Sequence, residues 1–419
     1  MNLQSQTMTR SVGITVISML LATLLAGAPA ASATTANDET TEAPAVRVQV
    51  GAVPPDGADL PFSYTRYYSE RLVVHRGQTV LFDTVEPFDL HTTSFVPGGF
   101  AAMPPLFRAN EQPEPFAVNE VVWQRSGCGS DGQAPCRLDG SQQLLNSGLN
   151  AVTGRNWRVT VDLPVGSRAR FYCMVHPGMR GSVQVVDDAV RLPTQAEIDA
   201  QTREQVKADT EEAIGHRARR DSEVARRSEG GRDIWRVRVG DASPSRHVSI
   251  MAYMPNRLVG VRPGDAVEFV TTGVGHHSVA FPTALVGDKA IGAGSRLASA
   301  AVHPACDYDD LNGGAPGVPG PWAPFSPLEC SGAFELLVSP WAASPTRAPG
   351  DAVLTAATYH DSGLMWSEQV PEYARGRPAG SGEYFPHSFI AEFPVEGSFG
   401  YACTIHGADH MAGSIEVGA

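Results

Sequence analysis

The sequence predicts an all-β fold of two β-sandwich domains, joined by one charged helical segment. Short stretches alternate apolar and polar residues, as around Val80 and Phe82 and again around Val267 and Phe269. Glycine and proline, with 42 and 32 residues, separate many of these stretches. Short alternating strands punctuated in this way are typical of antiparallel β-sandwiches.

Landmarks recur in the same order in the two halves of the chain, which indicates a duplicated domain. "VRVQVG" at residues 46–51 corresponds to "WRVRVG" at 235–240, and further matches follow in each half. We therefore expect a first domain over residues 45–191, a helical linker over 192–231 and a second domain over 232–419.

The linker has the pattern of a helix. We expect the helix to start near Thr194 and to end at the pair Gly230–Gly231, with acidic residues early and arginines late in between. Its apolar stripe is thin and consists chiefly of Ile198, Val206 and Ile214. We expect a solvated connector that lies along one domain; a partner-binding helix is the alternative.

Residues 1–33 have the features of a secretory signal peptide that is cleaved after Ala33. Arg10 precedes an apolar run from Val12 to Ala28, and small residues precede the expected cut. No second apolar run is long enough to span a bilayer, so the sequence predicts a secreted protein without a membrane span.

The charge balance bears on the class of partner. The formal net charge is −13 at pH 7. Nucleic-acid binding needs a basic face, so the composition argues against a nucleic acid as partner.

One short motif occurs twice in a chain that has just six cysteines. "FYCMVHPGMRG" begins at Phe171, and "YACTIHGADHMAG" begins at Tyr401. Each has a cysteine, a histidine three residues later, then a methionine, and a glycine two residues after the methionine. A further histidine stands upstream of each motif, after a matching strand pattern. The two resulting sets are His91, Cys173, His176 and Met179, and His277, Cys403, His406 and Met411.

These donors suit copper. A thiolate, two imidazoles and a weak thioether are the ligands of a blue-copper electron-transfer site. In the second half His276 precedes His277, and His277 is the better candidate because a hydroxyl residue and an apolar residue follow it, as they follow His91.

The two sets and their strand frames resemble the cupredoxins, the family of plastocyanin, azurin and amicyanin. The resemblance implies two Greek-key β-sandwiches, two copper ions with one in each domain, and electron transfer with a redox partner protein that the sequence does not identify. The family often has asparagine after the first histidine ligand, where this chain has Thr92 and Ser278. Their hydroxyl groups are candidates to replace that asparagine in joining the two ligand loops.

The sequence is compatible with other interpretations. The metal could be zinc, or the cysteine and methionine could pack in a copper-free domain. A copper protein could also sequester or deliver the metal instead of carrying electrons. A two-domain copper oxidoreductase is a further alternative. We do not expect an enzyme, because no histidine stands next to Cys173 or Cys403 to connect a second copper centre, and no His-x-His pair is present to hold a trinuclear cluster.

A long insertion separates the first histidine from the cysteine in each set, and each insertion contains two of the other four cysteines. Export to an oxidising compartment favours disulfides. Locality selects the pairings Cys128–Cys136 and Cys306–Cys330 among three possible ones.

Overall fold

The computed structural model describes thirteen stretches of the chain, which together include most of the predicted strands and the linker. They are residues 45–55, 60–86, 89–104, 107–109, 116–128, 136–150, 154–176, 178–281, 352–353, 360–362, 365–367, 386–403 and 411–418. The predicted signal peptide therefore lies outside the described residues, as do His406, Cys306 and Cys330.

The first half of the chain forms two five-stranded sheets, which we call the N-terminal sandwich. One sheet has the order β3-β1-β5-β11-β9, with β3 Tyr67–Tyr68, β1 Val46–Val50, β5 Thr79–Thr84, β11 Asn156–Val161 and β9 Cys136–Leu138. The other has the order β10-β6-β12-β13-β4, with β10 Leu145–Asn146, β6 Ser94–Phe95, β12 Arg168–Tyr172, β13 Arg180–Val186 and β4 Arg71–His75. Buried side chains from both sheets form one core, so the sheets face each other.

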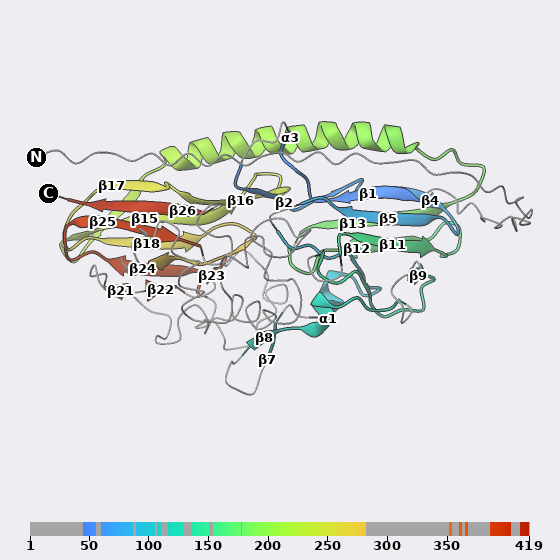
Figure 1. The fold of residues 1–419 in the computed structure, drawn as a ribbon, viewed down its shortest axis with the longest axis horizontal. Helices are drawn as coiled ribbons and strands as arrows, with labels where there is room; N and C mark the ends of the chain where they lie inside the picture. The colour runs from blue at the N-terminus through green and yellow to red at the C-terminus, as the bar shows by residue number, and fades with distance from the viewer. Residues whose placement is uncertain are drawn as a thin grey trace, which may run out of the picture. The chain divides into compact units, whose positions relative to one another are not determined.

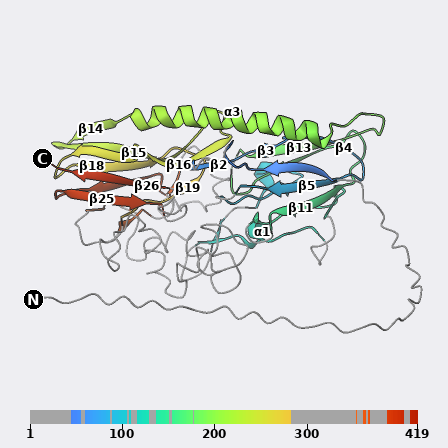
Figure 2. The same cartoon turned by 45° about the horizontal axis from the view of Figure 1, so that its top comes forward.

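The second half repeats this plan in what we call the C-terminal sandwich. Its larger sheet has the order β2-β16-β15-β18-β24-β21, with β2 Phe62–Tyr64, β16 Val248–Met254, β15 Arg232–Ala242, β18 Ala266–Thr271, β24 Ser388–Glu392 and β21 Ala352–Val353. Its other sheet has the order β17-β26-β25-β20-β22, with β17 Arg257–Val261, β26 Ala412–Val417, β25 Gly397–Ala402, β20 Ala280–Phe281 and β22 His360–Asp361. Figure 2 shows the yellow strands β15 and β18 and the red strands β25 and β26 in separate layers.

The remaining elements are short. They are the ribbon of β7 Phe107–Ala109 with β8 Phe116–Val118, the ribbon of β19 His276–His277 with β23 Met365–Trp366, the 3₁₀ turn η2 Phe100–Ala102 and the helix α1 Glu120–Trp123.

The all-β prediction is confirmed, and the alternation that supported it faces the core. Val80, Phe82, Val267 and Phe269 are all buried. The sheets are mixed and not antiparallel throughout, because each sandwich also contains parallel pairs such as β1 with β5 and β15 with β18. The chain crosses to the opposite sheet between such strands, so neighbours that are not consecutive in sequence run in the same direction.

The two sandwiches correspond strand by strand in their pairing. The parallel pairs β1–β5 and β4–β13 of the first match β15–β18 and β17–β26 of the second. The antiparallel pairs β5–β11, β12–β13 and β6–β12 match β18–β24, β25–β26 and β20–β25.

The glycine that follows each motif methionine is explained by a ring on the neighbouring strand. A Cβ atom on Gly181 would lie 2.3 Å from the ring of Phe171, and one on Gly413 would lie 2.5 Å from the ring of Tyr401. Both rings belong to the edge-to-face aromatic clusters of their cores. A larger residue at either glycine would displace the strand that carries the cysteine.

The predicted helix is present as α3, Gln195–Ser222, drawn in green in Figure 1. Its start is as predicted: Thr194 caps the helix, and Glu197 completes a capping box. Its end differs from the prediction. Gly230 and Gly231 form the turn between β14 Ala225–Glu229 and β15, both with positive φ angles.

The expectation that the linker lies along one domain is also wrong, because α3 contacts both halves of the chain. Near its start, Asp199 pairs with Arg47 of β1, and near its end Arg220 pairs with Asp241 of β15. Ile198 and Val206 are buried as the stripe predicts, whereas Ile214 is exposed. No helix among the residues that the structure describes is long and apolar enough to cross a membrane.

Strand β2 joins the halves directly. It precedes β3 in the chain, yet it pairs with β16 of the C-terminal sandwich, with Tyr64 opposite Val248. Beside it lies a third apolar cluster, to which β2, β16 and α3 all contribute. Next to this cluster, Asp209 of α3 lies 3.0 Å from the guanidinium of Arg66 and accepts a hydrogen bond from Tyr68.

Candidate metal centre

Three of the four predicted residues of the first set lie on one tight turn between β12 and β13. The Cys173 amide donates to the carbonyl of Met179 at 3.0 Å, and the Met179 amide donates to the carbonyl of His176 at 3.1 Å. Gly178, with φ +105°, supplies a conformation that few other residues adopt. The turn thus presents cysteine, histidine and methionine together at one end of the sandwich.

His91 comes from a different segment, shortly before β6. Its amide donates to the Asn150 side chain at 2.8 Å, and its carbonyl accepts from the Asn150 amide at 3.1 Å. Gly51 leaves room for the ring, since a Cβ atom there would lie 3.2 Å from Nε2 of His91 and closer still to Glu86. The backbone position of His91 is therefore fixed on both sides.

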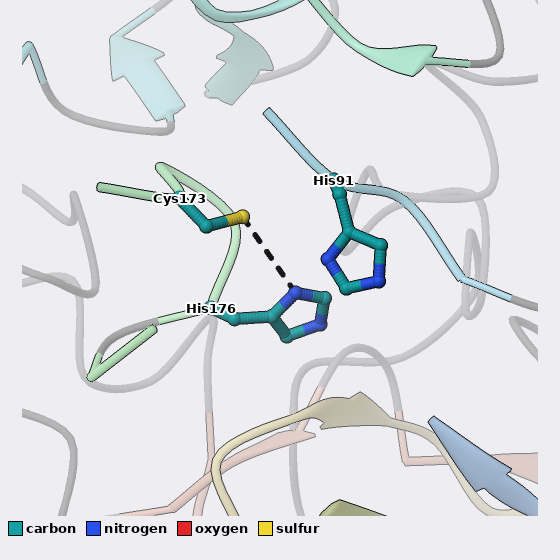
Figure 3. A group of neighbouring side chains, drawn as sticks. All are labelled: His91, Cys173 and His176. Carbon is teal, nitrogen blue, oxygen red and sulfur yellow. Dashed lines mark hydrogen bonds between the residues drawn. The ribbon is translucent and has the colours of Figure 1, made fainter. Parts of the chain in front are cut away.

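The structure brings His91, Cys173 and His176 together in a buried group, whose ligand atoms all lie within 4.8 Å of one another. Figure 3 shows the two rings beside each other, with the Cys173 sulfur turned toward Nδ1 of His176 at 3.8 Å. Among the described residues this is the single group of three or more such side chains.

The group has the character of a metal site. Neither ring nitrogen of His91 has a hydrogen-bond partner, although the residue is 1 % exposed. A buried polar atom without a partner is costly, and a bound cation would remove that cost. The residues present therefore fit a soft, imidazole-binding metal ion.

Ionisation of the group favours the same conclusion. Burial alone would raise the pKa of the Cys173 thiol, but its interactions with His176 and with the nearby ring of His91 outweigh burial, and the pKa lies well below its usual value. Burial likewise opposes protonation of His176, yet Asp89 and Cys173 raise the pKa of His176 to about 10. These neighbours favour the thiolate, which is the form of cysteine that binds metals.

Thr92 connects the two ligand segments. Its hydroxyl oxygen accepts from the Met174 amide at 2.8 Å, and its own amide lies 3.4 Å from the Cys173 sulfur. The Thr92 hydroxyl thus joins the segment of His91 to the turn that carries Cys173. This is the role that the sequence suggested for it in place of the asparagine often found in the cupredoxins.

Met179, the fourth predicted residue, is buried on the same turn. Its carbonyl holds the Cys173 amide, so its backbone shapes the loop as well.

The second set is described in part, and its described members repeat the environment of the first. His277, Cys403 and Met411 are buried, and the Cys403 amide donates to the carbonyl of Met411 at 3.0 Å. The amide of Ser278 lies 3.4 Å from the Cys403 sulfur, as Thr92 does from Cys173.

The contacts around His91, the first histidine of the first set, also recur around His277 in the second set. Gly240 has φ +66°, as Gly51 has, and a Cβ atom on Gly240 would lie 2.1 Å from Nε2 of His277. The hydroxyl of Tyr253 donates to the Ser278 carbonyl at 2.6 Å, as that of Tyr67 does to the Thr92 carbonyl. The neighbouring His276 instead lies against the ring of Trp366, with centroids 4.2 Å apart.

The cysteine pairing is as predicted where it is described. Cys128 and Cys136 form a disulfide, whereas the buried Cys173 and Cys403 are not joined by one.

Two supporting residues were missed from the sequence. Asn150 holds His91, and Asp89 lies 3.0 Å from Nε2 of His176. Asp89 stands two residues before His91, a spacing that could have marked it as a neighbour of the site. Asn150 carries no such signal, because it lies in the long insertion.

Comparison with known proteins gives structural neighbours alone: no family model and no curated protein matches the chain. Plastocyanin from the fern Dryopteris crassirhizoma is 18% identical, with a TM-score of 0.18, over 44% of this chain and 99% of its own. Auracyanin B is 15% identical, with a TM-score of 0.21, over 47% of this chain and 96% of its own. A copper-containing nitrite reductase from Thermus scotoductus is 13% identical, with a TM-score of 0.19, over 89% of this chain and 67% of its own. All three TM-scores are 0.21 or lower.

Proposed function

We propose that this protein is an exported electron carrier made of two tandem cupredoxin-like domains, each of which holds one copper ion in a type 1 (blue) site. The observation that carries the proposal is the buried group of His91, Cys173 and His176, in which a thiolate faces two imidazoles and one imidazole has no hydrogen-bond partner. Copper held by such a set changes between Cu(I) and Cu(II) with little rearrangement of its ligands.

The chain's own residues keep that rearrangement small. The Cys173 amide donates a hydrogen bond to the Met179 carbonyl, and the Met174 amide donates one to the Thr92 hydroxyl. The His91 amide donates one to the Asn150 side chain. Because each ligand is held by hydrogen bonds outside the metal, we expect the same positions in both oxidation states.

The matching strand pairs and the matching contacts of Ser278, Tyr253 and Gly240 support the duplication and a second copper site. We propose His277, Cys403, His406 and Met411 as its ligands. The Cys128–Cys136 disulfide supports export to an oxidising compartment, as does the predicted signal peptide at residues 1–33.

Burial favours electron transfer over copper delivery. His91, Cys173, His176 and Met179 are each no more than 2 % exposed. A site that passes its metal to another protein must let an incoming ligand reach it, whereas an electron needs no such opening. The redox partner is expected to be another protein.

The test is copper loading of the mature chain followed by voltammetry. We expect about two coppers per chain, intense blue or green absorption, and reversible waves with both metals retained. Rapid loss of Cu(I) to a modest chelator would favour delivery instead. Turnover of nitrite, or of phenols with oxygen, would favour an oxidoreductase, and a colourless Cu(II) complex would contradict the type 1 assignment.

A further inference from the structure

The carboxylate of Asp89 contacts both a backbone amide next to it and a histidine ring of the candidate metal site. Its Oδ1 accepts a hydrogen bond from the Leu90 amide at 2.7 Å, and its Oδ2 lies 3.0 Å from Nε2 of His176. The Asp89 side chain is 11 % exposed and that of His176 is 1 % exposed, so this contact is largely shielded from water.

This contact determines which nitrogen of His176 faces the ligand group. When a metal ion takes the place of one proton of the ring, a carboxylate at Nε2 keeps the remaining proton on that nitrogen, which leaves the lone pair on Nδ1 for the metal. Nδ1 is the atom that lies 3.8 Å from the Cys173 sulfur. The same carboxylate makes the imidazole a stronger donor, because it draws the Nε2 proton toward itself.

The second half lacks this carboxylate at the corresponding position. Counting two residues back from the first histidine of each set gives Asp89 before His91 but Gly275 before His277. The two sites, alike in their proposed ligands and supports, therefore differ at this position.

We propose that Asp89 is a positioning residue for the first metal, which makes that site bind Cu(II) more tightly, and hold a lower reduction potential, than it would without the carboxylate. The proposal rests on the proposed function, since it concerns copper at the first set. A stronger nitrogen donor stabilises Cu(II) relative to Cu(I), so the potential falls.

The experiment uses the full chain with Cys403→Ser, which leaves a thiolate at the first site alone. Asp89→Asn in this background keeps an oxygen that can accept from the Leu90 amide and removes the carboxylate from His176. We expect Cu(II) affinity to fall roughly 10- to 100-fold, the usual effect of losing such a partner, and the potential to rise. Asp83→Asn is the matched control: it removes the same charge from β5, where Asp83 lies 3.5 Å from Arg47, and should change neither quantity appreciably.

A second readout is independent of redox behaviour. In the Cu(I) form, proton NMR should show a slowly exchanging His176 Nε2–H resonance that Asp89→Asn removes or shifts. Unchanged affinity, potential and resonance in Asp89→Asn would overturn the proposal. If the Cys403→Ser parent itself shows no thiolate-to-copper band, the proposed function fails instead, so the two failures are separable.

Discussion

Replacing Cys173 with serine is expected to remove about half of the thiolate-to-copper absorption of the fully loaded chain. In a chain that also carries Cys403→Ser, the absorption should vanish. The reason is that the band needs a copper–thiolate bond, and a serine hydroxyl does not supply one at neutral pH. Affinity at the first site should fall by more than the roughly 10- to 100-fold expected for loss of an outer partner.

Visible spectroscopy and copper analysis of the two single variants and the double variant measure this directly. Cys403→Ser alone is the matched control, because it leaves the first site unchanged. An undiminished band in Cys173→Ser would show that this thiolate is not a ligand.

Replacing Asp209 with alanine is expected to destabilise the protein by about 3 kcal/mol, because it removes a buried carboxylate and leaves the largely shielded guanidinium of Arg66 with Glu70 as its remaining ion-pair partner. The side chains of Asp209 and Arg66 are 7% and 13% exposed, and Tyr68 and His247 also hydrogen-bond to Asp209. Denaturant unfolding of the metal-free chain measures the change.

Asp199→Ala is the matched control on the same helix. Its ion pair with Arg47 is about a third exposed on the Asp199 side, so its loss should cost no more than about 1 kcal/mol. Equal effects of the two substitutions would contradict the importance that we assign to the buried pair.

The contribution of Asp209 to the free energy of unfolding should also depend on pH. Burial, the largest influence, opposes ionisation, but hydrogen bonds from His247 and Arg66 outweigh it and hold the pKa of Asp209 below its usual value. A carboxyl group with a lowered pKa in the folded state stabilises the protein above its unfolded pKa, near 4, and loses that contribution as pH falls through the folded pKa. The difference between wild type and Asp209→Ala should therefore be full at pH 6 and shrink in acid.

Local pattern was enough to predict the sandwiches and the helix start, because burial on one face imposes alternation and a cap has a short signature. It failed where pairing is decided at long range. Strand β14 is exposed along its whole length and has no apolar alternation, so it forms because β15 pairs with it. Strand β2 pairs with β16, far along the chain, and no local signal marks that partner.

The candidate site was predictable because its cysteine, histidine and methionine lie within one turn, where spacing shows that they belong together. His91 could be predicted because a histidine follows the matching strand pattern in both halves of the chain. Asn150 and Arg66 were not predicted, since each acts on a residue that only the fold brings near.

Copper-edge X-ray absorption of the Cys403→Ser chain, loaded with one equivalent of Cu(II), tests the proposed ligands of the first site most directly. We expect one short copper–sulfur bond and two copper–nitrogen bonds, from Cys173, His91 and His176. A first shell of nitrogen and oxygen alone, without sulfur, would contradict the assignment of this group as a type 1 copper site.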